Sequence, residues 1–201
     1  RVSEFVDPKS GVSARLTISA YESLISTAEL RFLKSGDPYS FARISDLYGA
    51  TPSINGKIEL VYEGEQEGPA VIAQNLISMA IRNLFVQLFP DPAKLKRKKE
   101  SSDYAAITNW FSQGNVIDLL DHEKDKVYIS ALTIVDGLED LVAKYHPKAR
   151  GAERYALMEF ALHGLAEHSL LSKNKLIEGV TFKDLFGSLL NQGSGFEQEE
   201  N

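Results

Sequence analysis

The stretch GVSARLTISAYESLISTAELRFLKSG, residues 11–36, decides how the first part of this chain folds. A row of small and apolar side chains recurs in it every four residues, at Leu16, Ala20, Leu24 and Ala28. This spacing places the row on one face of an amphipathic helix. Ser13 is a residue type that caps helix starts, and Gly36 is the residue type most common just after a helix end. We therefore predict a helix over 13–36.

Further helices are predicted before residue 90. The clearest covers 69–89, where Pro69 suits the first turn and apolar residues follow the helical repeat. A short helix is expected over 42–49. The stretch 53–62 is ambiguous, because alternating apolar residues favour a strand whereas Pro52, ahead of helically spaced isoleucines, favours a helix. We expect a helix there.

The second half of the chain also has helical patterns. A segment of prolines, lysines and serines, 91–102, separates it from the first half and is expected to be a linker. Helices are predicted after this linker over 103–111, 115–121, 124–145, 152–172 and 181–190. The Gly-, Ser- and Glu-rich tail 191–201 is expected to be disordered. The fold class predicted is all-α, with a helical domain at 1–90 and a helical bundle at 103–190.

Composition narrows the function classes. The chain has 201 residues and a formal net charge of −6, which argues against nucleic acid as a partner because phosphate binding needs a basic surface. Cysteine is absent, which excludes disulfides and thiolate metal sites and suits a reducing cytoplasm. No uninterrupted apolar run reaches the roughly 18 residues of a membrane span. We expect a cytoplasmic protein with no membrane partner.

Ser13 and Arg15 lie where the first helix is expected to begin. The backbone N–H groups at a helix start point outward, and the helix dipole makes that end electropositive. An arginine there is unfavourable by itself, but an anion shared by the helix end and the guanidinium would account for it. The alternative is a solvent-exposed arginine that merely tolerates the position.

The motif Gly11-Val12-Ser13-Ala14-Arg15 at the start of this helix resembles the sensor-2 segment of AAA+ ATPases of the magnesium-chelatase and MoxR type. The stretch 7–89, with GKIELVYEGEQEG at 56–68, resembles the helical lid domain of magnesium-chelatase-like bacterial proteins. The resemblance implies that this chain is the C-terminal part of such an ATPase, a lid followed by a helical extension. It also implies that Arg15, together with Ser13, contacts the phosphates of ATP.

The nucleotide-binding core of such an ATPase is missing from this sequence. No Gly-x-x-x-x-Gly-Lys-[Ser/Thr] motif is present, because Gly56-Lys57 is followed by Ile58 and Thr51 stands where the first glycine belongs. The first residue is Arg1, and we expect the sequence to be part of a longer protein. The implied cofactors, ATP and Mg²⁺, would be bound by the parent protein and not by this chain alone. The implied partners are the upstream core, neighbouring subunits of a ring, with six subunits expected, and a protein substrate.

Two groups of carboxylates are candidate cation ligands. Glu63, Glu65 and Glu67 lie in a glycine-bounded stretch, 63–68, that we expect to be an acidic loop. They could hold a divalent cation, but the pattern lacks the spacing of a calcium loop. A solvated loop, or one that docks on a basic surface of a neighbouring subunit, is the expectation.

Three residues of the second half share a helix face, namely Glu159, His163 and Glu167. The pattern is not His-Glu-x-x-His, so a surface helix with one partly buried histidine is favoured over a metal site. The basic run Lys94–Lys99 is expected to be solvated linker rather than a nucleic-acid contact. We assign Trp110 and Phe111 to the core.

A second function fits the same sequence. The chain could be a stand-alone helical module that binds a protein partner through a groove, in which Arg15 has no nucleotide role. A helix-turn-helix regulator is disfavoured by the acidic net charge.

Overall fold

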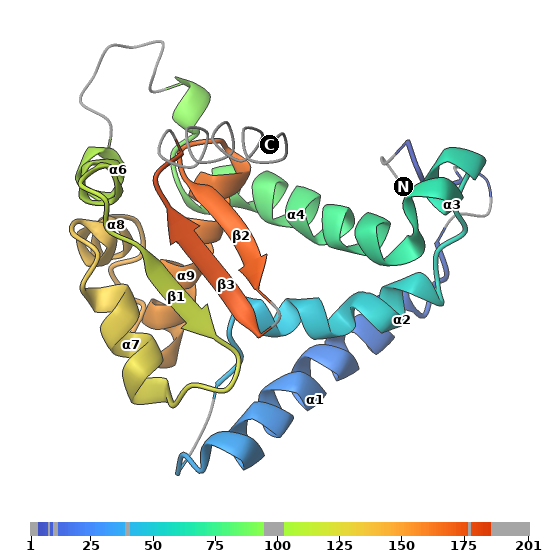
Figure 1. The fold of residues 1–201 in the computed structure, drawn as a ribbon, viewed down its shortest axis with the longest axis horizontal. Helices are drawn as coiled ribbons and strands as arrows, with labels where there is room; N and C mark the ends of the chain where they lie inside the picture. Colours follow the sequence, from blue (N-terminus) through green and yellow to red (C-terminus); the bar gives the residue numbers. More distant parts are fainter. Residues whose placement is uncertain are drawn as a thin grey trace, which may run out of the picture. The chain divides into compact units, whose positions relative to one another are not determined.

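The structure, a computed structural model, describes residues 4–7, 9, 12–38, 41–94, 103–176 and 178–185. The chain forms two compact units, residues 1–80 and 81–201 (Figure 1). The division falls within helix α4, Pro69–Leu88, whose bounds match the helix predicted over 69–89. Residues 95–102, most of the predicted linker, and the predicted tail 191–201 lie outside the described residues.

Helix α1, Leu16–Ser35, is the main element of the first unit. It confirms most of the helix predicted over 13–36. Gly36 ends it in the left-handed conformation, with φ of 68°, and its N–H donates to Phe32 O at 3.2 Å. Lys34 in the last turn places a positive charge at the negative end of the helix dipole.

The other elements of the first unit are short. α1 packs on the 3₁₀-helix η1, Ser45–Ala50, and on α2, Thr51–Asn55. α3, Tyr62–Glu67, occupies the stretch predicted to be an acidic loop, so that prediction is wrong. The helix expected over 53–62 is also wrong beyond Asn55, because the chain becomes extended and forms single antiparallel bridges there.

Helix α4 has one further property. Within the described part of the chain, it is the helix whose length and composition would allow it to cross a membrane. Core helices of soluble proteins meet the same criterion, so this is weak evidence for a membrane.

The second unit contains both helices and strands. Its elements beyond α4 are α6 (Ala105–Ser112), β1 (Ile117–Leu120), α7 (Asp125–Thr133), α8 (Leu138–Tyr145), α9 (Ala152–Glu167), β2 (Ser172–Leu176) and β3 (Gly179–Lys183). The strands form an antiparallel sheet in the order β1-β3-β2 (Figure 1). The all-α prediction is therefore wrong, and the second unit is not a helical bundle.

Alternating burial explains why β1 and β3 are strands where the sequence pattern predicts helices. β3 covers only 181–183 of the helix predicted over 181–190, and residues 186–190 lie outside the described residues. Ile117 and Leu119 are buried while Asp118 between them is exposed, a period of two that suits a strand rather than the helix predicted over 115–121. In β3, Val180 and Phe182 are buried in the same way.

The helical pattern of 181–190 predicts that Thr181 caps a helix, but Thr181 lies within β3. Instead it faces Asp118 across the β1–β3 pair, and its hydroxyl donates to Asp118 Oδ1 at 2.5 Å.

The helix predicted over 124–145 is interrupted. α7 ends at Thr133 and α8 begins at Leu138. Gly137 between them has a φ of 76°, a backbone angle that residues other than glycine rarely adopt. A β-carbon at this position would also lie 2.5 Å from Ala106 Cβ, so α6 leaves no room for a side chain. The interruption lets α7 and α8 pack on α9 from different directions.

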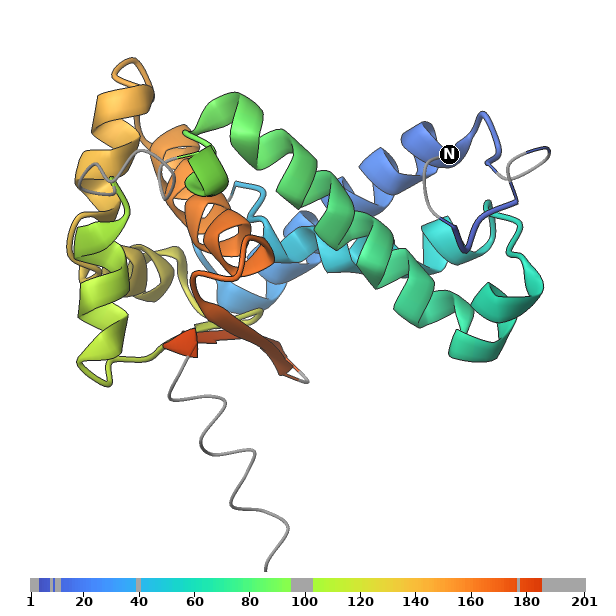
Figure 2. The ribbon, with the colours of Figure 1, turned by 90° about the horizontal axis from the view of Figure 1, so that it is seen from above.

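Helix α9 forms the centre of the second unit. Every residue from Met158 to Leu165 is buried, and the view from above shows the sheet on one side of the helix (Figure 2). Near its C-terminal end, Phe85 is surrounded by four rings at centroid distances of 5.3–6.3 Å, those of Phe89, Tyr104, Phe160 and His168. Tyr104 donates its hydroxyl hydrogen to Pro90 O, which satisfies a polar group in this aromatic core.

Gly164 of α9 allows Phe85 to approach the helix backbone. A β-carbon at Gly164 would lie 2.0 Å from Phe85 Cδ2, so Gly164→Ala should force the ring out of its position. We expect a loss of about 1–3 kcal/mol in the free energy of unfolding, measured by chemical denaturation. Gly56→Ala is the control, because its β-carbon would have no neighbour closer than 3.9 Å and its φ is −79°. A Gly164→Ala variant as stable as the control would contradict this packing.

Candidate functional site

Antiparallel pairing with the segment after α2 fixes the chain ahead of α1. Val6 pairs with Leu60 and Val12 with Ile58. Ser13 N donates to Lys57 O at 2.9 Å, immediately before the chain enters α1. The ambiguous stretch 53–62 therefore contributes both a helix and an extended strand, and the strand holds the start of α1 in place.

Ser13 and Arg15 lie at the start of α1, as predicted, but the local geometry differs from a capped helix. α1 begins at Leu16, and Arg15 occupies the cap position with φ of −83°. Ser13 Oγ accepts the N–H of Arg15 at 3.3 Å, and Ser13 O accepts the N–H of Leu16 at 3.0 Å. Ser13 thus closes a turn that leads into the helix. Gly11 of the motif lies outside the described residues.

The Arg15 side chain is exposed and, within the described parts of the chain, has no hydrogen bond or ion pair. The first turn of α1 contains no acidic residue that could neutralise it. A cation at the positive end of a helix dipole is unfavourable without a counter-charge. The site therefore has the free guanidinium and the electropositive helix end that an anion such as phosphate would need.

Arg15 is the first of a row of exposed side chains along α1. Steps of three and four residues continue this row through Ile18, Glu22, Ile25, Glu29 and Leu33, so apolar side chains alternate with carboxylates. Ile18 is 62% exposed and Leu33 is 75% exposed. Glu22 and Glu29 are exposed as well. This surface, the α1 face, combines apolar side chains with two carboxylates and ends at Arg15.

A buried ion pair holds α1 on the rest of the first unit. Arg31 and Asp46 of η1 are each 4% exposed, and Arg31 Nη2 donates to Asp46 Oδ2 at 2.9 Å. Arg31 Nη2 also donates to Phe41 O at 2.5 Å, and Arg43 N donates to Asp46 Oδ2 at 2.7 Å. The network orients the buried side of α1, and thereby decides that the α1 face and Arg15 point outward.

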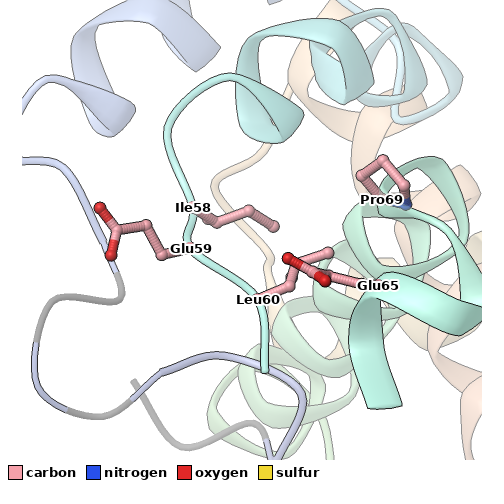
Figure 3. Close-up of a pocket in the computed structure, with 5 residues that line it drawn as sticks. All are labelled: Ile58, Glu59, Leu60, Glu65 and Pro69. Carbon is pink, nitrogen blue, oxygen red and sulfur yellow. The ribbon is translucent and has the colours of Figure 1, made fainter. Parts of the chain in front are cut away.

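A pocket of about 480 Å³ lies beside the strand that pairs with the N-terminal segment. It is lined by Ile58, Glu59, Leu60, Glu65 and Pro69 (Figure 3). Figure 3 shows the Glu59 carboxylate turned away from the other four side chains. Carboxylates at a pocket repel phosphate, so this pocket does not suit the anion inferred for Arg15.

No cluster of three or more histidine, aspartate or glutamate side chains in the described residues could hold a metal ion. Glu65 and Glu67 of the predicted acidic loop are exposed on α3. Of the basic run Lys94–Lys99, only Lys94 is described, and it is exposed. The predicted core residues Trp110 and Phe111 are buried.

The face of α9 expected at the surface is buried instead. Glu159 and His163 are both fully buried, and Tyr128 of α7 donates its hydroxyl hydrogen to Glu159 Oε2 at 2.8 Å. His163 Nε2 lies 3.7 Å from Glu159 Oε1. Glu167 pairs with Lys173 of β2 at 2.5 Å. Sequence reasoning missed Tyr128 because nothing in the local pattern connects it with a residue 31 positions later.

Comparison with known proteins does not assign the chain to a family. No protein-family model matches it, and neither a curated protein nor a solved structure does.

The Arg31–Asp46 pair gives a stability prediction for the first unit. Asp46→Ala leaves a buried guanidinium without its carboxylate, which typically costs about 3–5 kcal/mol. We expect the free energy of unfolding to fall by this amount, measured by chemical denaturation of the whole chain. Glu139→Ala is the control, because its ion pair with Arg154 is 30–50% exposed and such pairs contribute about 0–1 kcal/mol. Equal effects of the two substitutions would show that the buried pair does not hold α1.

Proposed function

We propose that this chain is the C-terminal part of a magnesium-chelatase-like AAA+ ATPase. In this proposal the first unit is the lid, and Arg15 contacts a phosphate of ATP bound by the upstream core. The second unit transmits the movement of the lid to a protein partner, which is remodelled or receives a metal ion. Nucleotide hydrolysis is carried out by residues that are not part of this chain.

The observation that carries the proposal is the exposed Arg15 guanidinium at the start of a 20-residue helix. Charge-assisted hydrogen bonds from arginine to phosphate are among the stronger contacts in proteins. The antiparallel bridges and the hydrogen bond from Ser13 N to Lys57 O hold the backbone at the helix start in a defined position. A nucleotide sensor needs such a fixed backbone, because the guanidinium then reaches the phosphate from a defined point.

The α1 face supports the proposal independently of the motif. Exposed apolar patches rimmed by polar residues mark surfaces that another protein covers. Ile18, Ile25 and Leu33 are exposed on the side of α1 that carries Arg15, with Glu22 and Glu29 between them. A partner protein that covers the α1 face would also lie beside Arg15. A ligand bound at the edge of that partner could then contact the Arg15 guanidinium. An ATPase core carrying ATP at its edge would meet both requirements.

The α1 face also favours the second candidate function, a stand-alone interaction module. In that case a protein partner covers Ile18, Ile25 and Leu33, and Arg15 contacts a carboxylate of that partner or solvent. The two functions differ in one respect, the dependence of nucleotide binding on Arg15.

The test is Arg15→Ala in the full-length protein. Loss of a charge-assisted hydrogen bond costs about 1.5–3 kcal/mol, so ATP affinity or turnover should fall roughly ten- to a hundredfold. Arg15→Lys should restore only part of the ATP affinity or turnover, since lysine keeps the charge but lacks the planar guanidinium. The melting temperature should be nearly unchanged, because the side chain is exposed.

Lys34→Ala is the matched control, since Lys34 is an exposed cation at the other end of α1. It should leave nucleotide binding unchanged. Normal ATP affinity and turnover in a folded Arg15→Ala protein would reject the nucleotide role and favour the interaction module.

A further inference from the structure

Two ionisable side chains lie at the centre of α9, away from solvent. Glu159 and His163 are both 0% exposed, and Glu159 Oε1 lies 3.7 Å from His163 Nε2. Burying a charge is costly unless partners compensate for it. A change in the protonation of either group therefore changes the stability of the packing around α9.

Different elements cover the two groups. Tyr128 of α7 donates to Glu159 Oε2 at 2.8 Å, so the carboxylate faces a helix that supplies a hydrogen bond. The ring of His163 faces Phe182 of β3 edge to face, with centroids 5.0 Å apart and an angle of 89°. His163 is thus a buried polar side chain of α9 that contacts β3 directly through Phe182.

Charged groups near His163 act on its protonation in both directions. Lys173 of β2 disfavours the protonated form of His163, whereas Glu159 and Glu167 of α9 favour it. The elements around α9 carry further charged residues, among them Asp125 and Lys126 of α7, Glu139, Asp140 and Lys144 of α8, Asp118 of β1, Lys175 of β2, Lys183 of β3 and Arg82 of α4.

Burial is the largest influence on His163 and lowers its pKa below the usual value of 6.5, more than the Glu159 carboxylate raises it. The imidazole is therefore neutral in the closed unit at neutral pH. When the sheet opens and His163 is hydrated, the ring regains its ordinary pKa and binds a proton more readily. The stability of the closed form relative to the open form is therefore fully present above about pH 6.5. It is lost as the pH falls from 6.5 towards the pKa that His163 has in the closed form.

We propose that His163 is a proton-sensitive latch, whose neutral ring holds β3 on α9 and whose protonation releases β2 and β3 from the helix and from their pairing with β1. The latch uses residues of the second unit only and does not depend on a nucleotide contact at Arg15. It would expose the apolar side of the sheet, including Val180 and Phe182, in response to acidification.

The experiment is hydrogen exchange of the whole chain between pH 7.5 and pH 5.0, corrected for the intrinsic pH dependence of amide exchange. The opening constant for residues 179–183 should rise up to about tenfold for each pH unit below 6.5, as expected for uptake of one proton. His163→Phe keeps a ring against Phe182 but cannot bind a proton, so this rise should disappear.

His122→Gln is the matched control. His122 is exposed and pairs with Glu178, next to the start of β3, so it lies at the same sheet without being buried. This variant should open on acidification like the natural chain. Exchange at 179–183 that does not change with pH, or that rises equally in His163→Phe, would overturn the latch.

A direct titration covers the case in which His163→Phe does not fold. The imidazole of His163 can be followed by NMR in the natural chain. Its midpoint should lie below the usual histidine value of 6.5 and coincide with the opening of 179–183. An ordinary midpoint, or protonation while the sheet stays closed, would overturn the proposal.

Discussion

The second unit depends on one constraint, that the middle of α9 has no side facing solvent. A helix enclosed on every side needs neighbours in every direction, and α7, α8 and the sheet supply them. The short loop at Gly137 allows α7 and α8 to approach from different angles. The sheet then covers a part of α9 that carries a histidine rather than a purely apolar side chain, so closure of the unit is tied to proton binding.

The main helix of the first unit is buried on one side only. α1 buries one side against η1 and α2 and leaves the other side uncovered. Because Arg31 and Asp46 can satisfy each other only in one orientation of the helix, the buried pair specifies which side is uncovered. Breaking such a pair is costly, because one charge then stays buried without its partner. The α1 face is therefore a defined surface, whichever partner covers it.

Long periodic segments made α1 and α4 predictable, since their apolar residues repeat over several turns and Gly36 or Pro69 marks an end. The sheet was not predictable, because strands of four or five residues fit either repeat and β3 is identified only through partners far along the chain. Glu159 was missed because glutamate is rarely buried, and its burial depends on the Tyr128 hydroxyl. Arg15 and Ser13 were found from a local motif, which needs no tertiary information.

The order β1-β3-β2 leaves β1 and β2 as edges whose outer sides could recruit strands from other molecules. Their sequences discourage this. β2 carries Lys173 and Lys175, and β1 is only four residues long and exposes Asp118. Charged side chains and short length are features by which natural sheets avoid edge-to-edge aggregation. The small sheet can thus keep two open edges without recruiting further strands, because the strands at those edges are poor templates for pairing.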